Sequence, residues 1–386
     1  MLEYALIGTR RYFMLLGALL VLILVGTYFY FQQLQYGLGY TTGLGRDVSW
    51  GFYIAQLTYL VGVAASAVMV VLPYYLHDYK AFGRITILGE FLAVAAVLMC
   101  LIFVIVDLGR PDRLANIIKY PTPNSVLFWD MIVLNTYLFL NIVIGWVVLE
   151  SERNQVKPPN WVKPLIILSI PWAPSIHTVT AFLYSGLPGR GYWLTAIMAP
   201  RFLSSAFAAG PSLLILLALL VRKYTKFDPG REQIQSLAKI VTYAILINVF
   251  FFFCEVFTVF YSQIPDHVLH FEYLFSGLQG KGWLVPWMWF SIGGMTIAAL
   301  LMVSPRIRRN ETTLALTCGL IILTTYIDKG LGLMTGGFVP NPLERVVEYK
   351  PTVPELLITL GVYGIGFLVL TILYKVAVSV KEEIRA

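Results

Sequence analysis

Charged residues, cysteine and histidine are all scarce in this sequence. Only 13% of its 386 residues are charged, about half of the roughly 25% typical of soluble domains. The cysteines stand singly in apolar runs, without a CxxC pair, and are Cys100, Cys254 and Cys318. This spacing disfavours a disulfide framework and a thiolate-bound metal or iron–sulfur cluster. Of the four histidines, only His177 falls deep inside an apolar run, so a membrane haem held by two histidines is not expected.

Hydrophobic residues are abundant instead, at 58% of the chain with a mean hydropathy of +0.75. A membrane-spanning helix needs about 20 predominantly apolar residues. Ten runs qualify: 12–31, 51–75, 85–107, 124–149, 164–185, 193–221, 236–261, 283–304, 312–331 and 353–379. No small-residue cleavage site follows the first run, so we expect it to be retained. We therefore predict an all-α polytopic membrane protein, with residues 1–386 forming one integral membrane domain.

The distribution of basic residues predicts the orientation of these helices. Of the 28 lysines and arginines, 18 fall on the side of the termini and the other 10 on the opposite side. Cytoplasmic loops carry an excess of Lys and Arg. We therefore predict a multi-pass protein of the cytoplasmic (inner) membrane with both termini in the cytoplasm. The net charge of +7 reflects this bias, and nucleic acid is not an expected partner.

A glycine-rich turn recurs on the predicted outer side. Tyr184-Ser-Gly-Leu-Pro-Gly-Arg-Gly-Tyr192 precedes the sixth span and Phe275-Ser-Gly-Leu-Gln-Gly-Lys-Gly-Trp283 precedes the eighth. Thr42-Gly-Leu-Gly-Arg46, before the second span, is a weaker copy. Two interpretations are open: a turn reused without any function, or a shared role in docking a partner protein.

Ionisable residues inside a bilayer cost a few kcal/mol each and often mark ligand or proton sites. Nearly all of them fall in the outer half of the predicted spans, and only Glu90 falls in the inner half. The outer group consists of Asp107, Asp130, His177, Arg201, Glu255, Asp328 and Lys329. The alternative is that Asp107, Asp328 and Lys329, at span ends, lie among lipid headgroups and that the other four only pair between helices.

A pocket where carboxylates, one histidine and one arginine meet apolar helices suits a lipid-soluble quinone, whose two oxygens take up and release protons. A histidine side chain ordinarily titrates near neutral pH, so His177 is expected to exchange those protons, with Asp130 and Glu255 as further catalytic groups. Arg201 is expected to pair with Glu255. No metal site is expected, because the sequence has no cluster of cysteines and histidines.

Several short motifs follow one another along the chain. They are Asp107-Leu-Gly-Arg-Pro111, Asn124-Ser-Val-Leu-Phe-Trp-Asp130, Ala199-Pro-Arg-Phe-Leu-Ser-Ser-Ala-Phe-Ala-Ala-Gly-Pro211, Phe338-Val-Pro-Asn-Pro-Leu343 and Glu348-Tyr-Lys-Pro-Thr352. The set covers about residues 40 to 355 and resembles the NrfD-like family, the membrane subunits of polysulfide reductases and their relatives. In its ten-span form the chain resembles the menaquinone-linked subunits of membrane complexes in sulfate reducers.

This resemblance implies two four-helix bundles, at 51–185 and 193–331, flanked by the helices at 12–31 and 353–379. It implies a menaquinone (menaquinol) pocket near the outer face and no haem or iron–sulfur cluster in the chain. The residues expected to bind the quinone are Asp107, Arg110, Asp130, His177 and Arg201. The implied partners are a periplasmic ferredoxin-like iron–sulfur subunit and cytochrome-containing subunits. The chain would then be active only within a respiratory oxidoreductase complex, as in sulfate respiration.

Two other classes of function remain as alternatives. A proton-coupled secondary transporter would also use buried carboxylates and broken helices, but it would place its site near the midplane and show inverted repeats. Here the repeated turns lead into helices of like orientation, and the ionisable residues lie shallow. A structural anchor for redox partners is the third possibility, and it would need neither a buried His177 nor a buried Glu255.

Overall fold

The computed structural model describes residues 1–64, 67–76 and 80–385. This part of the chain is largely helical and contains no strand, only an isolated β-bridge between Leu278 and Lys281. It includes ten helices that are long and apolar enough to cross a membrane. The predicted fold class, an all-α polytopic membrane protein, is thereby confirmed. The predicted second span, 51–75, includes residues 65–66, which lie outside the described residues.

The spans differ little from the predicted runs, except at the ninth. They are α1 (Arg10–Tyr36), α3 with α4 (Phe52–Ala64 and Val68–Leu76), α5 (Thr86–Asp107), α7 (Val126–Arg153), α8 (Val162–Ser185), α9 (Met198–Tyr224), α10 (Arg231–Ser262), α12 (Val285–Val303), α14 continued by η6 and α15 (Glu311–Tyr326, Ile327–Gly332 and Leu333–Phe338), and α16 (Val353–Arg385). Shorter helices lie between them: η1 (Leu2–Leu6), α2 (Leu38–Thr41), η3 (Lys80–Arg84), η4 (Pro111–Arg113), α6 (Asn116–Lys119), η5 (Gly191–Trp193), α11 (Pro265–Phe275) and α13 (Pro305–Arg309).

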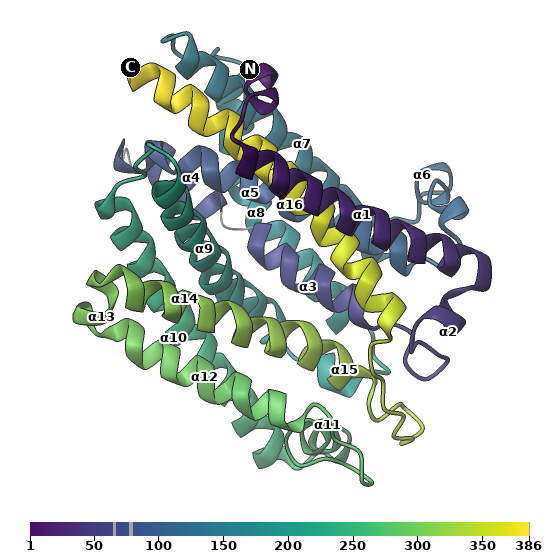
Figure 1. Ribbon diagram of the computed structural model, residues 1–386. Helices are drawn as coiled ribbons and strands as arrows, with labels where there is room; N and C mark the ends of the chain where they lie inside the picture. The colour runs from purple at the N-terminus through teal and green to yellow at the C-terminus, as the bar shows by residue number, and fades with distance from the viewer. Residues whose placement is uncertain (65–66, 77–79, 386) are drawn as a thin grey trace.

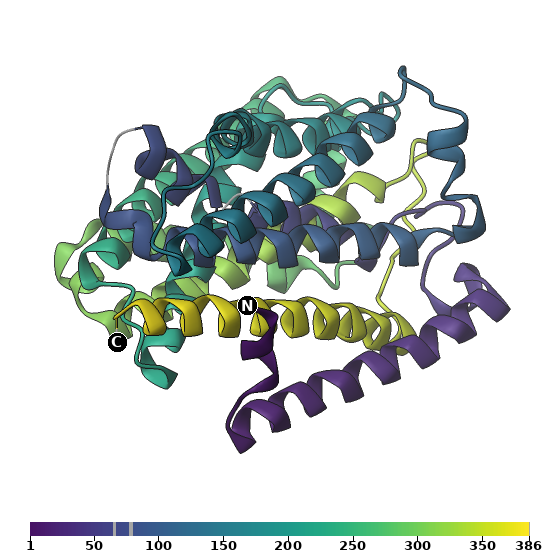
Figure 2. The same ribbon diagram turned by 90° about the horizontal axis from the view of Figure 1, so that it is seen from above.

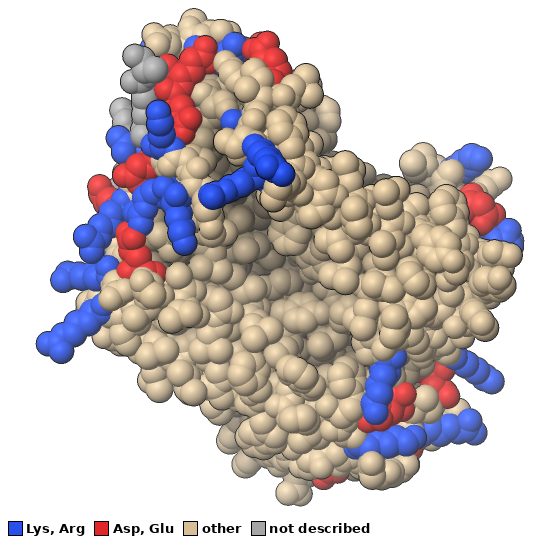
Figure 3. All heavy atoms as spheres, viewed as in Figure 1, with Lys and Arg blue, Asp and Glu red and all other residues tan. Residues whose placement is uncertain are grey.

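Both termini lie at the same end of the molecule, as Figure 1 shows, with α2, α6 and α11 at the opposite end. We call these the terminal end and the distal end. On the face drawn in Figure 3, charged side chains gather at these two ends and leave a broad band between them without charge. Such a band is what the hydrocarbon core of a bilayer, about 30 Å thick, requires of a protein surface.

The helices pack in two groups. In the first group, α3 packs against α5, α5 against α7 and α7 against α8. In the second group, α9 packs against α10 and α14, and α12 packs against α10 and α14. The two groups meet where α3 and α8 contact α9 and where α3 contacts η6. Buried polar side chains at this junction can therefore interact with residues of both helix groups.

Outside these groups, α16 lies between α1 and the rest of the molecule, as Figure 2 shows. Gly26 of α1 faces Gly361 of α16 so closely that a Cβ on Gly26 would lie 2.6 Å from the Gly361 Cα. Small residues let membrane helices approach in this way. Farther along α1, the buried Gln33 donates a hydrogen bond to the Val106 carbonyl at 2.6 Å and accepts one from the Tyr53 hydroxyl at 2.8 Å. These contacts attach α1 to the first group at the distal end.

Phe338, the last residue of α15, and the loop after it form a segment at the distal end, residues 338–352, that contacts all three glycine-rich turns. The Arg190 guanidinium of the first turn lies 4.3 Å from the centre of the Phe338 ring. In the second turn, the backbone N–H groups of Gly282 and Trp283 both donate to the Glu348 carboxylate at 3.0 Å. Next to the third copy, Asn341 donates to Asp47 at 2.8 Å. One segment therefore joins the three turns into a single surface.

Candidate functional site

A groove of about 800 Å³ lies between α5 and α7 in the distal half of the molecule. Its walls come from the last turns of α5, the first turns of α7 and the connecting segment at residues 110–118. Among the described residues these walls are apolar apart from Arg110, Arg113, Asp130 and Asn135. Several lining side chains also face the outside, so the groove opens at the surface of the helix bundle. Its size and its few polar groups are typical of a small-molecule site.

Asp130 is the carboxylate in the wall of this groove. It lies one turn into α7, on the side that packs against α8, and its side chain is 2% exposed. The hydroxyl of Thr180, on α8, donates to Asp130 Oδ1 at 2.7 Å. This hydrogen bond fixes the orientation of the carboxylate, so that Asp130 can meet the polar atoms of a molecule in the groove.

His177 lies on α8 one turn before Thr180, on the same face of the helix. It is fully enclosed, and neither ring nitrogen has a hydrogen-bond partner among the described residues. His177 is not among the residues that line the groove. Roughly 90% or more of buried polar groups in proteins are hydrogen-bonded, so a buried imidazole without a partner is a candidate for proton transfer.

In the second group, four charged side chains form a buried cluster, which we call the ion cluster: Arg201, Glu255, Asp328 and Lys329. The expected ion pair between Arg201 and Glu255 is present. Arg201 also binds Asp328, with 2.6 Å between Nη2 and Oδ1. With all four groups ionised, two positive charges balance two negative ones, as an ion cluster inside a low-dielectric region requires.

Asp328 and Lys329 correct the expectation from the sequence, which places them at the end of the ninth span. The helix continues past them through η6, a π-helix, to Phe338. Both side chains are therefore enclosed, at 2% and 5% exposure, and the headgroup alternative is wrong for them. π-Helical turns are rare and occur frequently at functional sites. In this turn, Asp328 points to Arg201 while Lys329 reaches the junction of the two helix groups.

The ammonium group of Lys329 lies at that junction. It donates to the Phe202 carbonyl at 3.2 Å and lies 4.3 Å from the centre of the Phe202 ring. A Cβ added to Gly62 of α3 would meet Lys329 Nζ at 3.2 Å. The lysine therefore connects the ion cluster to the first helix group.

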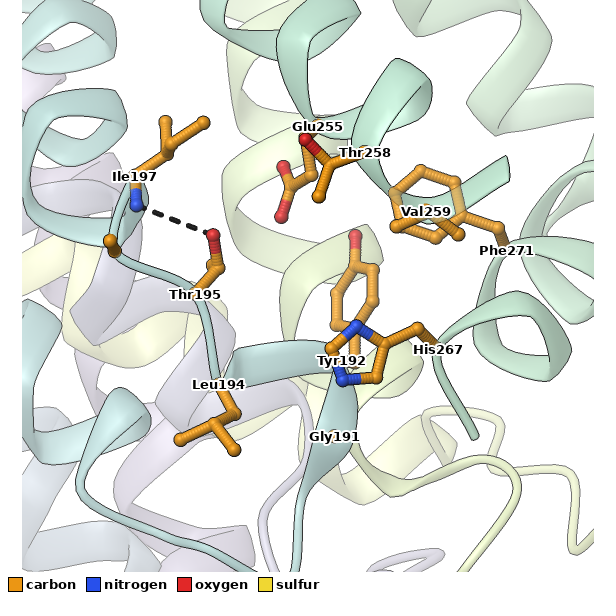
Figure 4. Close-up of a pocket in the computed structure, with 11 residues that line it drawn as sticks. Gly191, Tyr192, Leu194, Thr195, Ile197, Glu255, Thr258, Val259, His267 and Phe271 are labelled. Atoms are coloured by element: carbon orange, nitrogen blue, oxygen red, sulfur yellow. Dashed lines mark hydrogen bonds between the residues drawn. The ribbon is translucent and has the colours of Figure 1, made fainter. Parts of the chain in front are cut away.

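A second cavity, of about 330 Å³, lies between α10, α11 and the segment from η5 to the start of α9. Figure 4 shows the Glu255 carboxylate and the Tyr192 hydroxyl pointing toward one another across it, with the Thr195 hydroxyl turned to the same space. Thr258 and His267 also line it. The ion cluster therefore reaches this cavity through Glu255.

The structure separates the site residues expected from the sequence into four places. Asp130 and Arg110 line the groove, although Arg110 is exposed and forms a bidentate pair with Asp112, at 3.0 Å for each hydrogen bond. Asp107 lies at the end of α5, where its Oδ1 is buried without a hydrogen-bond partner in the described part of the chain. His177 lies behind the groove, and Arg201 and Glu255 belong to the other helix group.

Several residues of these sites have no clear signal in the sequence. Thr180 and Tyr192 look like ordinary polar residues near span ends, and only their partners in space reveal them. Glu355, at the start of α16, is fully buried and bonds the Tyr349 hydroxyl and the Phe52 backbone N–H. Its position just after the motif Glu348-Tyr-Lys-Pro-Thr352 is the only sequence feature that could have drawn attention to it.

Comparison with known proteins places this architecture in a family. The family profile described as polysulphide reductase, NrfD, matches residues 41–339, which is most of the chain. The chain belongs to this NrfD family. The residues of the groove, the ion cluster and the second cavity all fall within the matched region.

Three relatives illustrate the range of the family. A membrane subunit provisionally assigned to dimethyl sulfoxide reductase, from Halobacterium salinarum, is 26% identical over 92% of this chain and 88% of its own length. A subunit of selenate reductase from Mesobacillus selenatarsenatis is 24% identical over 84% of each chain. The Hdr-like menaquinol oxidoreductase integral membrane subunit of Archaeoglobus fulgidus is 22% identical over 97% of this chain and 95% of its own. The similarity thus extends over nearly the full length.

Proposed function

We propose that this NrfD-family protein is the quinone-reactive membrane subunit of a respiratory oxidoreductase complex, with menaquinol or menaquinone bound in the Asp130 groove. The observation that carries the proposal is the groove itself, an apolar space open at the surface of the helix bundle with one oriented carboxylate in its wall. A quinone that enters from the lipid could pack its ring against the apolar walls and place an oxygen near a proton acceptor, Asp130. The Archaeoglobus relative is named for menaquinol oxidation, which supports this choice of ligand.

The residues present fit such a ligand. A volume of about 800 Å³ is within the range of roughly 300–1,000 Å³ found for small-molecule sites. A quinol in the groove supplies two protons and two electrons when it is oxidised. Asp130 is placed to accept a proton, and Thr180 holds its carboxylate in orientation. Arg110 and Arg113 line the groove at the distal end, where the positive charge of a guanidinium would attract an oxygen that has lost its proton.

We propose that the electrons pass to a separate ferredoxin-like iron–sulfur subunit bound at the distal end, in a complex that also contains cytochrome subunits. Within the described residues, no three His, Cys, Asp or Glu side chains are grouped so that they could hold a metal ion. The distal surface, where residues 338–352 join the three glycine-rich turns, adjoins the groove end of the molecule and offers backbone and side-chain groups of both charges. In the proposed orientation, with the termini in the cytoplasm, this surface faces the periplasm.

Two relatives are named as subunits of a dimethyl sulfoxide reductase and a selenate reductase, so related chains are named for different terminal reactions. We therefore propose that the terminal reaction depends on the catalytic partner, and that it is sulfur or sulfate respiration here, on the resemblance of the motifs. The menaquinone groove and the distal surface do not depend on that choice.

The experiment compares quinol-linked electron transfer by the purified complex carrying Asp130→Asn with that of the parent. Removing a positioned proton-transfer group typically slows a reaction by about 10²–10⁴-fold, and we expect a loss in this range with the complex still assembled. Glu150→Gln is the matched control, because Glu150 is an exposed carboxylate on the same helix, α7. Near-normal turnover of Asp130→Asn in an intact complex would contradict the proposal.

A further inference from the structure

The groove and the second cavity lie in different helix groups, but a series of buried polar side chains lies between them. On the groove side, Thr180 bonds Asp130, and the unpartnered ring of His177 lies one turn away along α8. Lys329 then reaches across the junction from η6 to Gly62 of α3. The ion cluster follows, and Glu255 ends the series at the second cavity.

The gap within the ion cluster is small. A cavity of about 10 Å³ lies against Arg201, Asp328 and Lys329, close to the roughly 10–15 Å³ that one water molecule needs. Arg201 keeps its proton in proteins, so its role is to hold the Asp328 and Glu255 carboxylates beside one another. The groups that can take up and release protons are then His177, Lys329 and these two carboxylates.

The two cavities differ in a way that assigns them different roles. The walls of the groove are apolar around Asp130, and the other ionisable groups that line it, Arg110 and Arg113, are cations that cannot accept a proton. The second cavity carries hydroxyl groups of Tyr192, Thr195 and Thr258 and the imidazole of His267 around the Glu255 carboxylate. This number of polar groups is enough to bind ordered water. Residues of α11 line the cavity, and α11 lies at the distal end (Figure 1).

We propose that the second cavity is a proton port, through which protons released in the Asp130 groove leave for the aqueous phase at the distal end by way of His177, Lys329, Asp328 and Glu255. This proposal rests on the proposed quinone function. Each transfer moves one proton to a neighbouring lone pair and changes no oxidation state, while the electrons leave separately to the iron–sulfur subunit. For each proton that enters from Asp130, Lys329 passes its own to Asp328 and is reprotonated from His177. Glu255 then releases one proton to water beside Tyr192 and His267.

Water access to the port can be measured without any quinone. A thiol introduced by Thr195→Cys, in a Cys254→Ser background, should react with a membrane-impermeant, positively charged methanethiosulfonate reagent supplied at the distal side of membrane vesicles. Leu316→Cys is the control, because Leu316 is 71% exposed on α14, within the ninth span, where we expect it to face lipid. We expect at least tenfold faster reaction at Thr195→Cys. Equal, slow reaction of both thiols would overturn the port.

Proton transfer through the port is tested in the purified complex with Glu255→Gln, with Glu150→Gln again as the control. We expect the first turnover and the affinity for a quinone analogue to stay within twofold of the parent. Steady-state quinol turnover should fall at least tenfold, with a larger solvent deuterium isotope effect. Steady-state turnover within twofold of the parent would overturn the proposal, and so would an equal loss in the first turnover.

Thr258→Phe repeats this test if Glu255→Gln does not assemble, since it fills the cavity and leaves every charge in place. The same pattern, a normal first turnover with slow steady state, is expected, and parental turnover would overturn the port. Failure of the proposed function is recognised separately, because Asp130→Asn would then bind the quinone analogue and turn over like the parent. The thiol measurement would still decide whether the cavity is open to water.

Discussion

Replacing Arg201 with methionine should destabilise the protein severely, because Arg201 holds two buried carboxylates at once. Its guanidinium binds Glu255 and Asp328, and all three side chains are at most 10% exposed. Removing one partner of a buried ion pair typically costs about 3–5 kcal/mol, since the remaining charge is left without compensation. Arg201→Met leaves two acids and one base in the cluster, so we expect a loss of about 3–5 kcal/mol in the free energy of unfolding.

Unfolding by sodium dodecyl sulfate in mixed micelles, followed by the fluorescence of the nine tryptophans, measures this loss. The triple variant Arg201→Met, Glu255→Gln, Asp328→Asn provides the comparison, because it removes all three charges together. Replacing a buried ion network by neutral groups is often close to neutral for stability, so the triple variant should recover most of the loss. A cost below about 1 kcal/mol for Arg201→Met, or a triple variant as unstable as the single one, would refute the reasoning.

Three further predictions concern packing and pH. A Cβ on Gly337 would overlap the indole of Trp193, so Gly337→Ala should lower the thermal unfolding temperature by several degrees in a scanning assay; an unchanged temperature would contradict this packing. The backbones of Gly26 and Gly361 are in contact, so the side chain introduced by Gly361→Val should push α1 away from α16. The separated α1 should become sensitive to proteolysis in detergent, and persistent resistance would argue against the contact. Burial raises the pKa of Glu348, but hydrogen bonds from two backbone N–H groups and the neighbouring lysine lower it more, to a value below the ordinary 4.5. The stabilisation from Glu348 is therefore present at neutral pH and lost as the pH falls from 4.5 through the lower folded-state pKa. Protection from hydrogen exchange at the second glycine-rich turn, taken relative to the intrinsic exchange rate at each pH, should fall over that window in the parent and stay constant in Glu348→Gln.

Much of the fold could be predicted because apolar runs and membrane helices follow the same physical requirement. A span must hide its backbone polar groups in its own hydrogen bonds and cover them with apolar side chains, which leaves a strong sequence signal. The ninth span was the exception, since Asp328 and Lys329 look like the end of an apolar run. Their charges are compensated by partners on other helices, which a hydropathy pattern does not contain. The short helix α11, inside a predicted loop, is likewise invisible to a search for 20-residue runs.

The site could be predicted only in part, for a related reason. The depth of the ionisable residues correctly indicated that Arg201 and Glu255 form a pair, because a buried charge needs a partner. The depth of a residue in the membrane does not say on which side of its helix the side chain lies. Asp130 and His177 therefore looked like one pair in one pocket, whereas the structure puts Asp130 in the groove wall and His177 behind it. The roles of these residues in quinone chemistry stay predictions.

Photoaffinity labelling tests the central claim, a menaquinone site in the Asp130 groove, most directly. An azido-menaquinone analogue would be activated by light on the purified complex, and the labelled residues identified by mass spectrometry. We expect label on the groove walls, between Leu101 and Asn135, that is displaced by excess menaquinone and retained in the control Glu150→Gln. Displaceable label confined to the second cavity, at residues 191–197 or 255–271, or to neither cavity, would contradict it.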